Sequence, residues 1–275
     1  MKHIHKQDGQ ILLIVVMLFA LALTIVMSIS FKSITESQIT KLEEESQKAL
    51  AAAEAGIEAA LKTSDTGVKS FTDLGILSEL QPGIQTGSVT IESVQDTEFV
   101  TPVLMNDETY TFYLVDYNTE TGILSGTSYG GNLNIYYGQN SSDCSQIALE
   151  LTFISGNSPY TVTRYLADLG DKVSTVASSG RVGNTRGSAK TMEGISFWCE
   201  ILVITKPSDA KLLLARPINK DTRIGFEGGI PLKLQGKTIT SEAQSTGGVK
   251  KKVLFFQSYP QIHTGFYTTI FNSIN

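Results

Sequence analysis

The sequence has few of the residues that usually carry metal binding or redox chemistry. It contains two cysteines, three histidines and one tryptophan in 275 residues. The cysteines, Cys144 and Cys199, are far apart, and the sequence has no Cys-x-x-Cys pair, which disfavours a zinc site. His3, His5 and His263 have no carboxylates or cysteines beside them in a metal-ligand spacing. We therefore predict no metal site and no cofactor.

Catalytic motifs are missing as well. The sequence has no Gly-x-Ser-x-Gly elbow. Gly236-Lys237-Thr238 resembles the end of a phosphate-binding loop, but Pro231 occupies the place of the first glycine, so we expect a turn that leads into a strand. Trp198 lies in an apolar run and is expected in the core. These observations predict that the chain is not an enzyme, and an anchored hydrolase is the weakest alternative.

Charge is absent from one long stretch near the amino terminus. Ile11 to Phe31 is an uncharged run of 21 residues, which as a helix would be about 31 Å long, close to the hydrocarbon thickness of a membrane. Lys2 and Lys6 precede it, so we expect a cytoplasmic amino end and an exported remainder. The small-residue sites of a cleaved secretion signal fall inside the run rather than at its polar end, which favours an anchor.

The next segment, residues 32–62, is predicted to continue the same helix. It has no proline, one glycine, and many Ala, Glu, Lys and Leu residues. Glu44 and Lys48 have the favourable spacing of an ion pair on the solvent side. The expected apolar face consists of Ile39, Leu42, Leu50, Ala53, Ile57 and Leu61. An ordinary anchor with a stalk next to the membrane is the alternative interpretation.

A glycine marks the junction between the polar leader and the apolar run. A protease that cuts after Gly9 would remove residues 1–9 and leave Gln10 as the new amino terminus of an intact anchor. Glycine suits such a cut because a backbone without a side chain can enter a tight site at the membrane surface.

These pieces together resemble the amino-terminal region of type IV pilin-like proteins. The similarity is closest to PilX-type minor pilins and to the related K-type minor pseudopilins of type II secretion. It rests on GQILLIVVMLFALALTIVMSI, which has no acidic residue near the new terminus, and on QKALAAAEAGIEAAL. The resemblance covers residues 1–62 and is general beyond them, where ITSEAQSTGGVKKKVLFFQSYP resembles the final strand pair of such heads.

The resemblance implies processing by a prepilin peptidase, with Gly9 and Gln10 as the processing site, followed by N-methylation of the new terminus. Family members usually carry an apolar residue where this chain has Gln10. Major pilins have a Glu at the position of Ile14. A buried carboxylate can pair with the amino group of a neighbouring subunit, and a subunit without it suits a priming or tip position better than repeated stacking. The resemblance therefore implies a minor role in assembly.

From residue 63 onward, β-branched and aromatic runs bounded by Gly, Asn, Ser or Asp predict strands. The runs are 88–94, 109–117, 133–138, 146–154, 160–167, 195–204, 237–244 and 251–259. Gly- and Ser-rich segments near 118–132 and 178–190 are expected to be loops. The predicted fold class is α+β, a pilin-like arrangement with a long amino-terminal helix packed against a mainly antiparallel β head. The predicted domains are a leader (1–9), a transmembrane half-helix (10–31), a spine half-helix (32–62) and an extracytoplasmic head (63–275).

Two features of the head remain open. Cys144 and Cys199 could form a disulfide outside the cytoplasm or serve as small buried hydrophobes. Four basic residues without an intervening acid, Lys172, Arg181, Arg186 and Lys190, could contact anionic surfaces or DNA on a mobile loop. Such a loop is more often simply solvated, and the net charge of −5 gives no general attraction to nucleic acid.

The leading functional hypothesis is a minor pilin in the inner membrane, with its head outside the cytoplasm, which enters a type IV pilus-like fibre. Its expected partners are membrane lipid, the prepilin peptidase and other pilin subunits through the amino-terminal helix. Small residues such as Ala20, Ala22, Thr24, Ser28 and Ser30 permit close helix packing. The alternatives are a minor pseudopilin of type II secretion and a membrane-tethered adhesin or binding module that never assembles.

Overall fold

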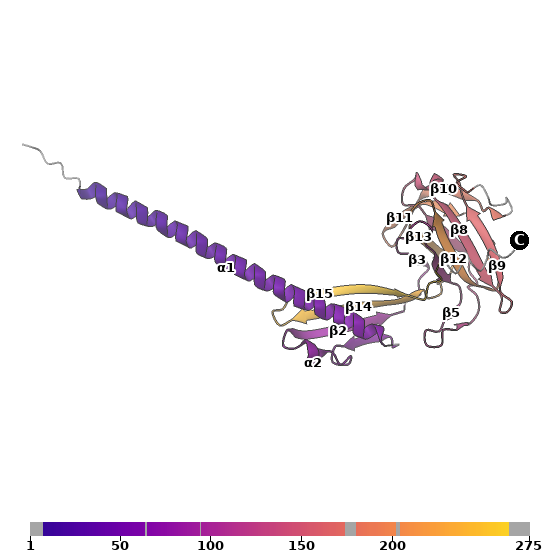
Figure 1. Ribbon diagram of the computed structural model, residues 1–275, viewed down its shortest axis with the longest axis horizontal. Coiled ribbons are helices and arrows are strands. Elements are labelled where there is room, and N and C mark those ends of the chain that lie inside the picture. The colour runs from indigo at the N-terminus through magenta and orange to yellow at the C-terminus, as the bar shows by residue number, and fades with distance from the viewer. Residues whose placement is uncertain (1–7, 64, 94, 174–179, 202–203, 264–275) are drawn as a thin grey trace, which may run out of the picture. The chain divides into compact units, whose positions relative to one another are not determined.

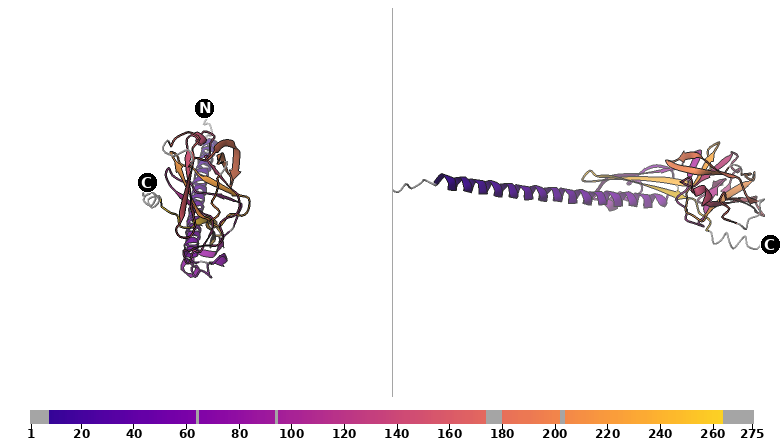
Figure 2. Two further views of the ribbon diagram at one scale, coloured as in Figure 1. Left: turned by 90° about the vertical axis from the view of Figure 1, so that its right-hand side faces the viewer. Right: turned by 90° about the horizontal axis from the view of Figure 1, so that it is seen from above.

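One long helix dominates the amino-terminal part of the computed structural model, which describes residues 8–63, 65–93, 95–173, 180–201 and 204–263. Helix α1 spans Asp8–Leu61, 54 residues, and continues past residue 31 without interruption (Figure 1, Figure 2). The prediction of a single helix from the apolar run to about residue 62 is confirmed. Leader residues 1–7 lie outside the described part.

The chain divides into two compact units. The spine unit comprises residues 1–63, 67–90 and 240–254, and the head unit comprises residues 64–66, 91–239 and 255–275. Segments 67–90 and 240–254, which the sequence analysis assigned to the head, thus belong with the helix. The fold class is α+β as predicted, with α1 packed on a mainly antiparallel β structure.

The sheet of the spine unit has the strand order β1-β2-β14-β15. The strands are β1 (Gly67–Ser70), β2 (Ile84–Glu92), β14 (Gly236–Ser245) and β15 (Lys250–Ser258), and the last residues of β2 and β15 and the first of β14 extend into the head unit. A short helix, α2 (Leu77–Leu80), lies between β1 and β2. The final strand pair expected from the sequence is present as β14 and β15.

The helix face that meets this sheet is made of small residues. Ala49, Ala52, Ala53 and Ala60 are fully buried and Ile57 nearly so, at helical spacings of three and four. Ile39, Leu42 and Leu50 of the expected apolar face are 50%, 57% and 41% exposed, so these three do not pack on the sheet. The physical reason is that the sheet contacts α1 only from about Glu45 onward, and there it approaches alanines and a glycine.

The head unit contains two larger sheets and one short strand pair. The sheets have the orders β10-β11-β7-β13-β3 and β4-β12-β8-β9, and β5 pairs with β6. The first sheet comprises β3 (Glu98–Val100), β7 (Leu133–Tyr137), β10 (Asn184–Met192), β11 (Ile195–Ile201) and β13 (Ile224–Gly228). The second comprises β4 (Tyr110–Tyr113), β8 (Ala148–Ser155), β9 (Thr161–Ala167) and β12 (Ala210–Ile218). Strands β5 (Asp116–Tyr117) and β6 (Leu124–Ser125) and the 3₁₀ helix η1 (Asp143–Ser145) complete the described elements.

The core of the head unit lies between its two large sheets. Phe112 of β4 stacks on Phe226 of β13 with 4.1 Å between ring centroids, which joins the sheets across the core. Leu149, Leu151 and Phe153 are every second residue of β8, and all three are fully buried in this core. Trp198 is half-buried and packs against this core, consistent with the role expected from its apolar surroundings.

The eight predicted strand runs all contain observed strands, but the sequence analysis missed others. Strands β1, β3, β12 and β13 were not predicted. The two predicted loops are also partly wrong, because residues 118–132 contain β6 and residues 178–190 contain the first part of β10. Pro217 within β12 has no N–H to donate to a neighbouring strand. Its carbonyl accepts a hydrogen bond from Asp107 beyond the end of β4, so the N–H that proline lacks is on a side without a strand partner.

Candidate functional site

The apolar half of α1 is built to contact a hydrophobic environment. Every described side chain from residue 12 to residue 44 is exposed, and α1 is long and apolar enough to cross a membrane. The Thr24 hydroxyl donates to the Leu21 carbonyl at 2.8 Å and the Ser30 hydroxyl donates to the Val26 carbonyl at 2.9 Å. Because these hydroxyls are satisfied within the helix, they do not oppose burial in lipid or among other helices.

The predicted processing site lies at the start of this helix. Gly9 and Gln10 follow Asp8 in the first turn of α1. The basic and histidine residues of the leader fall outside the described residues. Cleavage after Gly9 stays a prediction.

The packing of α1 on the sheet depends on two glycines, Gly56 of α1 and Gly87 of β2, which both approach the ring of Phe71. A Cβ on Gly56 would lie 2.7 Å from Phe71 Cε1 and also closer than 3.0 Å to the Ser241 hydroxyl oxygen. A Cβ on Gly87 would likewise lie within 3.0 Å of the Phe71 ring. Phe71 is fully buried between these glycines, so helix, ring and sheet are packed as closely as backbone contact allows.

A polar contact fixes the β14–β15 turn to the helix. The Gly247 N–H donates to Glu45 Oε2 at 3.0 Å, and Lys48 pairs with Glu44 at 2.7 Å and with Glu45 at 3.6 Å. Hydrogen bonds from the Ser245 hydroxyl and the Gly247 N–H lower the pKa of Glu45. The hydrogen bond to Glu44 raises the pKa of Lys48, and the predicted Glu44–Lys48 ion pair is confirmed. The Glu45 side chain is only 12% exposed, and its ionised form holds the turn.

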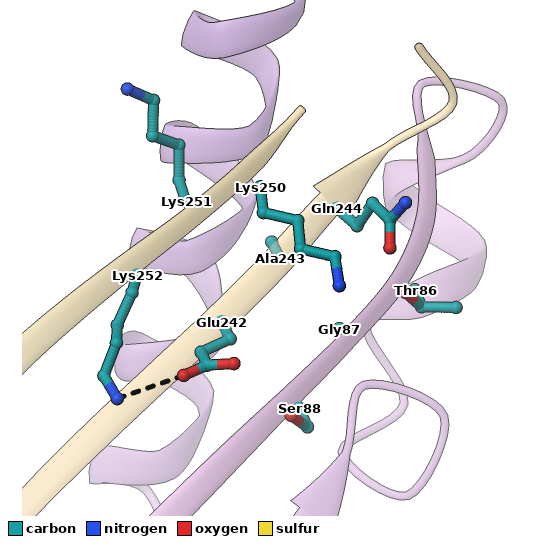
Figure 3. A pocket seen from close by; sticks show the side chains of 9 residues that line it. All are labelled: Thr86, Gly87, Ser88, Glu242, Ala243, Gln244, Lys250, Lys251 and Lys252. Atoms are coloured by element: carbon teal, nitrogen blue, oxygen red, sulfur yellow. Dashed lines mark ion pairs between the residues drawn. The ribbon is translucent and has the colours of Figure 1, made fainter. Parts of the chain in front are cut away.

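A shallow polar groove of about 400 Å³ lies on the spine-unit sheet (Figure 3). Its walls come from β2, β14 and β15, and Lys252 pairs with Glu242 at 3.1 Å across the two last strands. The lining residues are Thr86, Gly87, Ser88, Glu242, Ala243, Gln244, Lys250, Lys251 and Lys252. Six of these nine residues carry hydroxyl, amide or ammonium groups and Glu242 carries a carboxylate, so the groove offers both hydrogen-bond donors and acceptors.

The four basic residues singled out in the head unit do not form an open basic loop. Arg181 pairs with Asp171 at 2.7 Å and lies 3.8 Å from Asp168. Arg186 is on β10, opposite Cys199 of β11. The expectation of a loop is therefore wrong for Arg186 and for Lys190, because both belong to a strand.

Lys190 is also neutralised by acidic neighbours on other strands. It pairs with Glu98 at 3.2 Å and contacts Glu227 directly, and this hydrogen bond lowers the pKa of Glu227. Lys172 is exposed, and residues 174–179 lie outside the described part. Contact of Lys172 and Arg186 with anionic surfaces stays a prediction.

The two cysteines are joined. Cys144 of η1 and Cys199 of β11 form a disulfide with an S–S distance of 2.16 Å, and both are fully buried. Beside the bridge, Lys220 donates to Asp143 at 2.6 Å. Of the two roles left open by the sequence, the structure has the bridge, which ties η1 to the five-stranded sheet.

Sequence reasoning missed the residues that organise the spine unit, namely Gly56, Phe71, Glu45 and the lysines of β15. The available signals were the small residues repeated at helical spacing before Lys62 and the Gly247-Gly248 turn followed by three lysines. Among the described residues, no three His, Cys, Asp or Glu side chains gather as metal ligands would. No protein-family profile, curated protein or solved structure matches the chain.

Proposed function

We propose that this chain is a minor pilin-like subunit: an inner-membrane protein cut after Gly9 by a prepilin peptidase, which then primes or caps a type IV pilus-like fibre. The observation that carries the proposal is the uninterrupted helix Asp8–Leu61, with one uncharged exposed part and one part packed on a sheet. The remaining support comes from the amino-terminal resemblance.

The uncharged part of α1 suits both lipid and a bundle of similar helices. Its exposed surface is formed by large apolar side chains, while small residues such as Ala20 and Ala22 allow neighbouring backbones to approach. Its described hydroxyl groups on Thr24 and Ser30 are bonded to the helix itself. A subunit with this helix can leave the membrane for a fibre while these two hydroxyls stay hydrogen-bonded at both stages.

The second part of α1 suits a shaft that carries a globular domain. Ala49, Ala52, Ala53 and Ala60 are buried against the sheet, and Gly56 contacts it without a side chain. Since closely packed interiors transmit strain, force applied to the helix reaches the spine-unit sheet directly. A flexible stalk between anchor and domain would lack this property.

The proposed minor role follows from the residue at position 14. Ile14 offers no carboxylate to the amino terminus of a neighbouring subunit. Each repeat of a long shaft would therefore lack one charge pair in a dry environment, which is costly. A priming or tip position avoids that cost, since one neighbour is absent there.

The experiment is to express the chain in a bacterium that assembles type IV pili and to measure its amount in sheared fibres. We expect the chain in the fibre fraction at a small fraction of the major subunit. Gly9→Phe should stay in the membrane fraction at full length, while Gln10→Met, a matched control next to the cut, should enter fibres normally.

The alternatives predict different results in the same experiment. A membrane-tethered module would never appear in the fibre fraction and would be unaffected by Gly9→Phe. A chain found as the most abundant fibre subunit would contradict the minor role.

A further inference from the structure

We propose that the outer edge of β15 takes up an extended acidic segment of another protein, which adds a fifth strand to the spine-unit sheet. Strand β15 is the last in the order β1-β2-β14-β15, so its outer side has no strand partner in the sheet. An unpaired edge offers a row of N–H and C=O groups to an incoming chain. This inference does not depend on fibre assembly.

The hairpin geometry identifies which residues face that edge. The Ser245 N–H donates to the Val249 carbonyl at 2.9 Å, and Gly248 at φ +86° closes the three-residue loop. At the far end of the hairpin, the Tyr259 N–H donates to the Gln235 carbonyl at 2.9 Å. Both bonds belong to one antiparallel register.

In this register, odd-numbered residues of β15 exchange hydrogen bonds with β14. The even-numbered residues of β15 direct their N–H and C=O groups away from β14, toward the free edge. Lys250, Lys252 and Leu254 are these residues within the spine unit. Among the described residues, the N–H groups of these three donate to no backbone carbonyl outside the sheets.

The charge of the edge selects the partner. Lys250 and Lys251 have no ion-pair partner among the described residues, and Lys252 pairs with Glu242 while remaining 61% exposed. Lysines on an edge strand oppose pairing with apolar or basic strands, because they cannot be desolvated cheaply. The same lysines favour a strand whose carboxylates lie opposite them.

The groove on the spine-unit sheet shows which face of the sheet the edge lysines share. Lys250 and Gln244 lie at its wall, and Thr86 and Ser88 line the opposite side on β2 (Figure 3). Alternate side chains of an added strand point to the same face of the sheet as Lys250 and Lys252. Acidic side chains at these positions would meet the ammonium groups of Lys250 and Lys252, whereas the hydroxyls of β2 lie two strands beyond β15.

Strand addition is tested with the detergent-solubilised full chain and a labelled peptide of about eight residues that alternates Thr and Glu. We expect the Thr-Glu peptide to bind at least tenfold more tightly than a Thr-Lys peptide of the same length. Binding should weaken at about 0.5 M salt, since exposed charges are then screened. Lys250→Glu with Lys252→Glu should lower the affinity at least tenfold, and Lys250→Arg with Lys252→Arg should retain it. Lys62→Glu with Lys172→Glu, which changes the net charge equally elsewhere, should have little effect.

The edge itself is tested at Leu254, whose side chain is 66% exposed. Leu254→Pro removes one outward N–H and should lower the affinity about five- to tenfold, whereas Leu254→Ala keeps the N–H and should bind normally. In the unsubstituted chain, the amides of Lys250, Lys252 and Leu254 should exchange more slowly with the Thr-Glu peptide bound. Failure of this peptide to bind, or binding without slower exchange, would overturn strand addition.

Discussion

The close approach of α1 to its sheet predicts that alanine at position 56 destabilises the helix. At an exposed helical site, Gly→Ala stabilises by about 1 kcal/mol because glycine loses more backbone entropy on folding. At Gly56 the added Cβ would lie 2.7 Å from Phe71 Cε1 and too close to the Ser241 hydroxyl. Overpacking of this kind costs about 1–3 kcal/mol, so we expect a net loss of about 1 kcal/mol for Gly56→Ala.

The assay is hydrogen exchange of the amides in segment 49–60 of the detergent-solubilised chain. A loss of about 1 kcal/mol should speed exchange about fivefold if these amides open together. Ala51→Gly, at an exposed position of the same helix, calibrates the loss from propensity alone. Slower exchange in Gly56→Ala would show that the site has room for a methyl group and would refute the packing argument.

A second substitution separates the two contacts. The Ser241 hydroxyl is buried without a hydrogen-bond partner among the described residues, so Ser241→Ala should be neutral or stabilising. The double variant Gly56→Ala/Ser241→Ala should be more stable than Gly56→Ala alone, because one of the two obstacles is gone. Any remaining loss is then assigned to Phe71.

Two further predictions concern Glu45 and the disulfide. The pKa of Glu45 is lowered from its usual 4.5, so ionised Glu45 stabilises the fold above pH 4.5, and this stabilisation is lost as the pH falls through the lower pKa of the folded state. Amide exchange in the 246–249 turn should therefore accelerate as the pH falls through this range. Glu45→Gln should remove this pH dependence. Replacing Cys144 and Cys199 by Ala should lower the unfolding free energy of the head unit by about 2–4 kcal/mol in urea denaturation, with no change in exchange of α1 segment 49–60; an unchanged midpoint would contradict a stabilising bridge.

The long helix could be predicted from the sequence because its signals are local. Length, uncharged composition and strong helix formers together place it correctly through residue 61. The face of α1 that packs on the sheet could not be predicted from such local signals. Hydrophobic periodicity favours Leu42 and Leu50, whereas the sheet approaches alanines and Gly56, where close backbone contact decides the orientation.

The sheet contents were less accessible because they depend on distant partners. Strand β10 has a polar, glycine-containing sequence and takes its strand geometry from pairing with β11. The polar groove joins residues 86–88 to residues 242–252, and periodicity within either segment says nothing about that pairing. The lysines after Gly248 were visible in the sequence, but their position on an edge strand was not.

The most direct test of the proposed function is the mass of the mature amino-terminal peptide, measured on protein extracted from membranes and from sheared fibres. Processing after Gly9 predicts that both begin at Gln10, with the added mass of one methyl group. A peptide that begins at Met1 in fibre-forming cells, or one that begins near Phe31, would contradict the account.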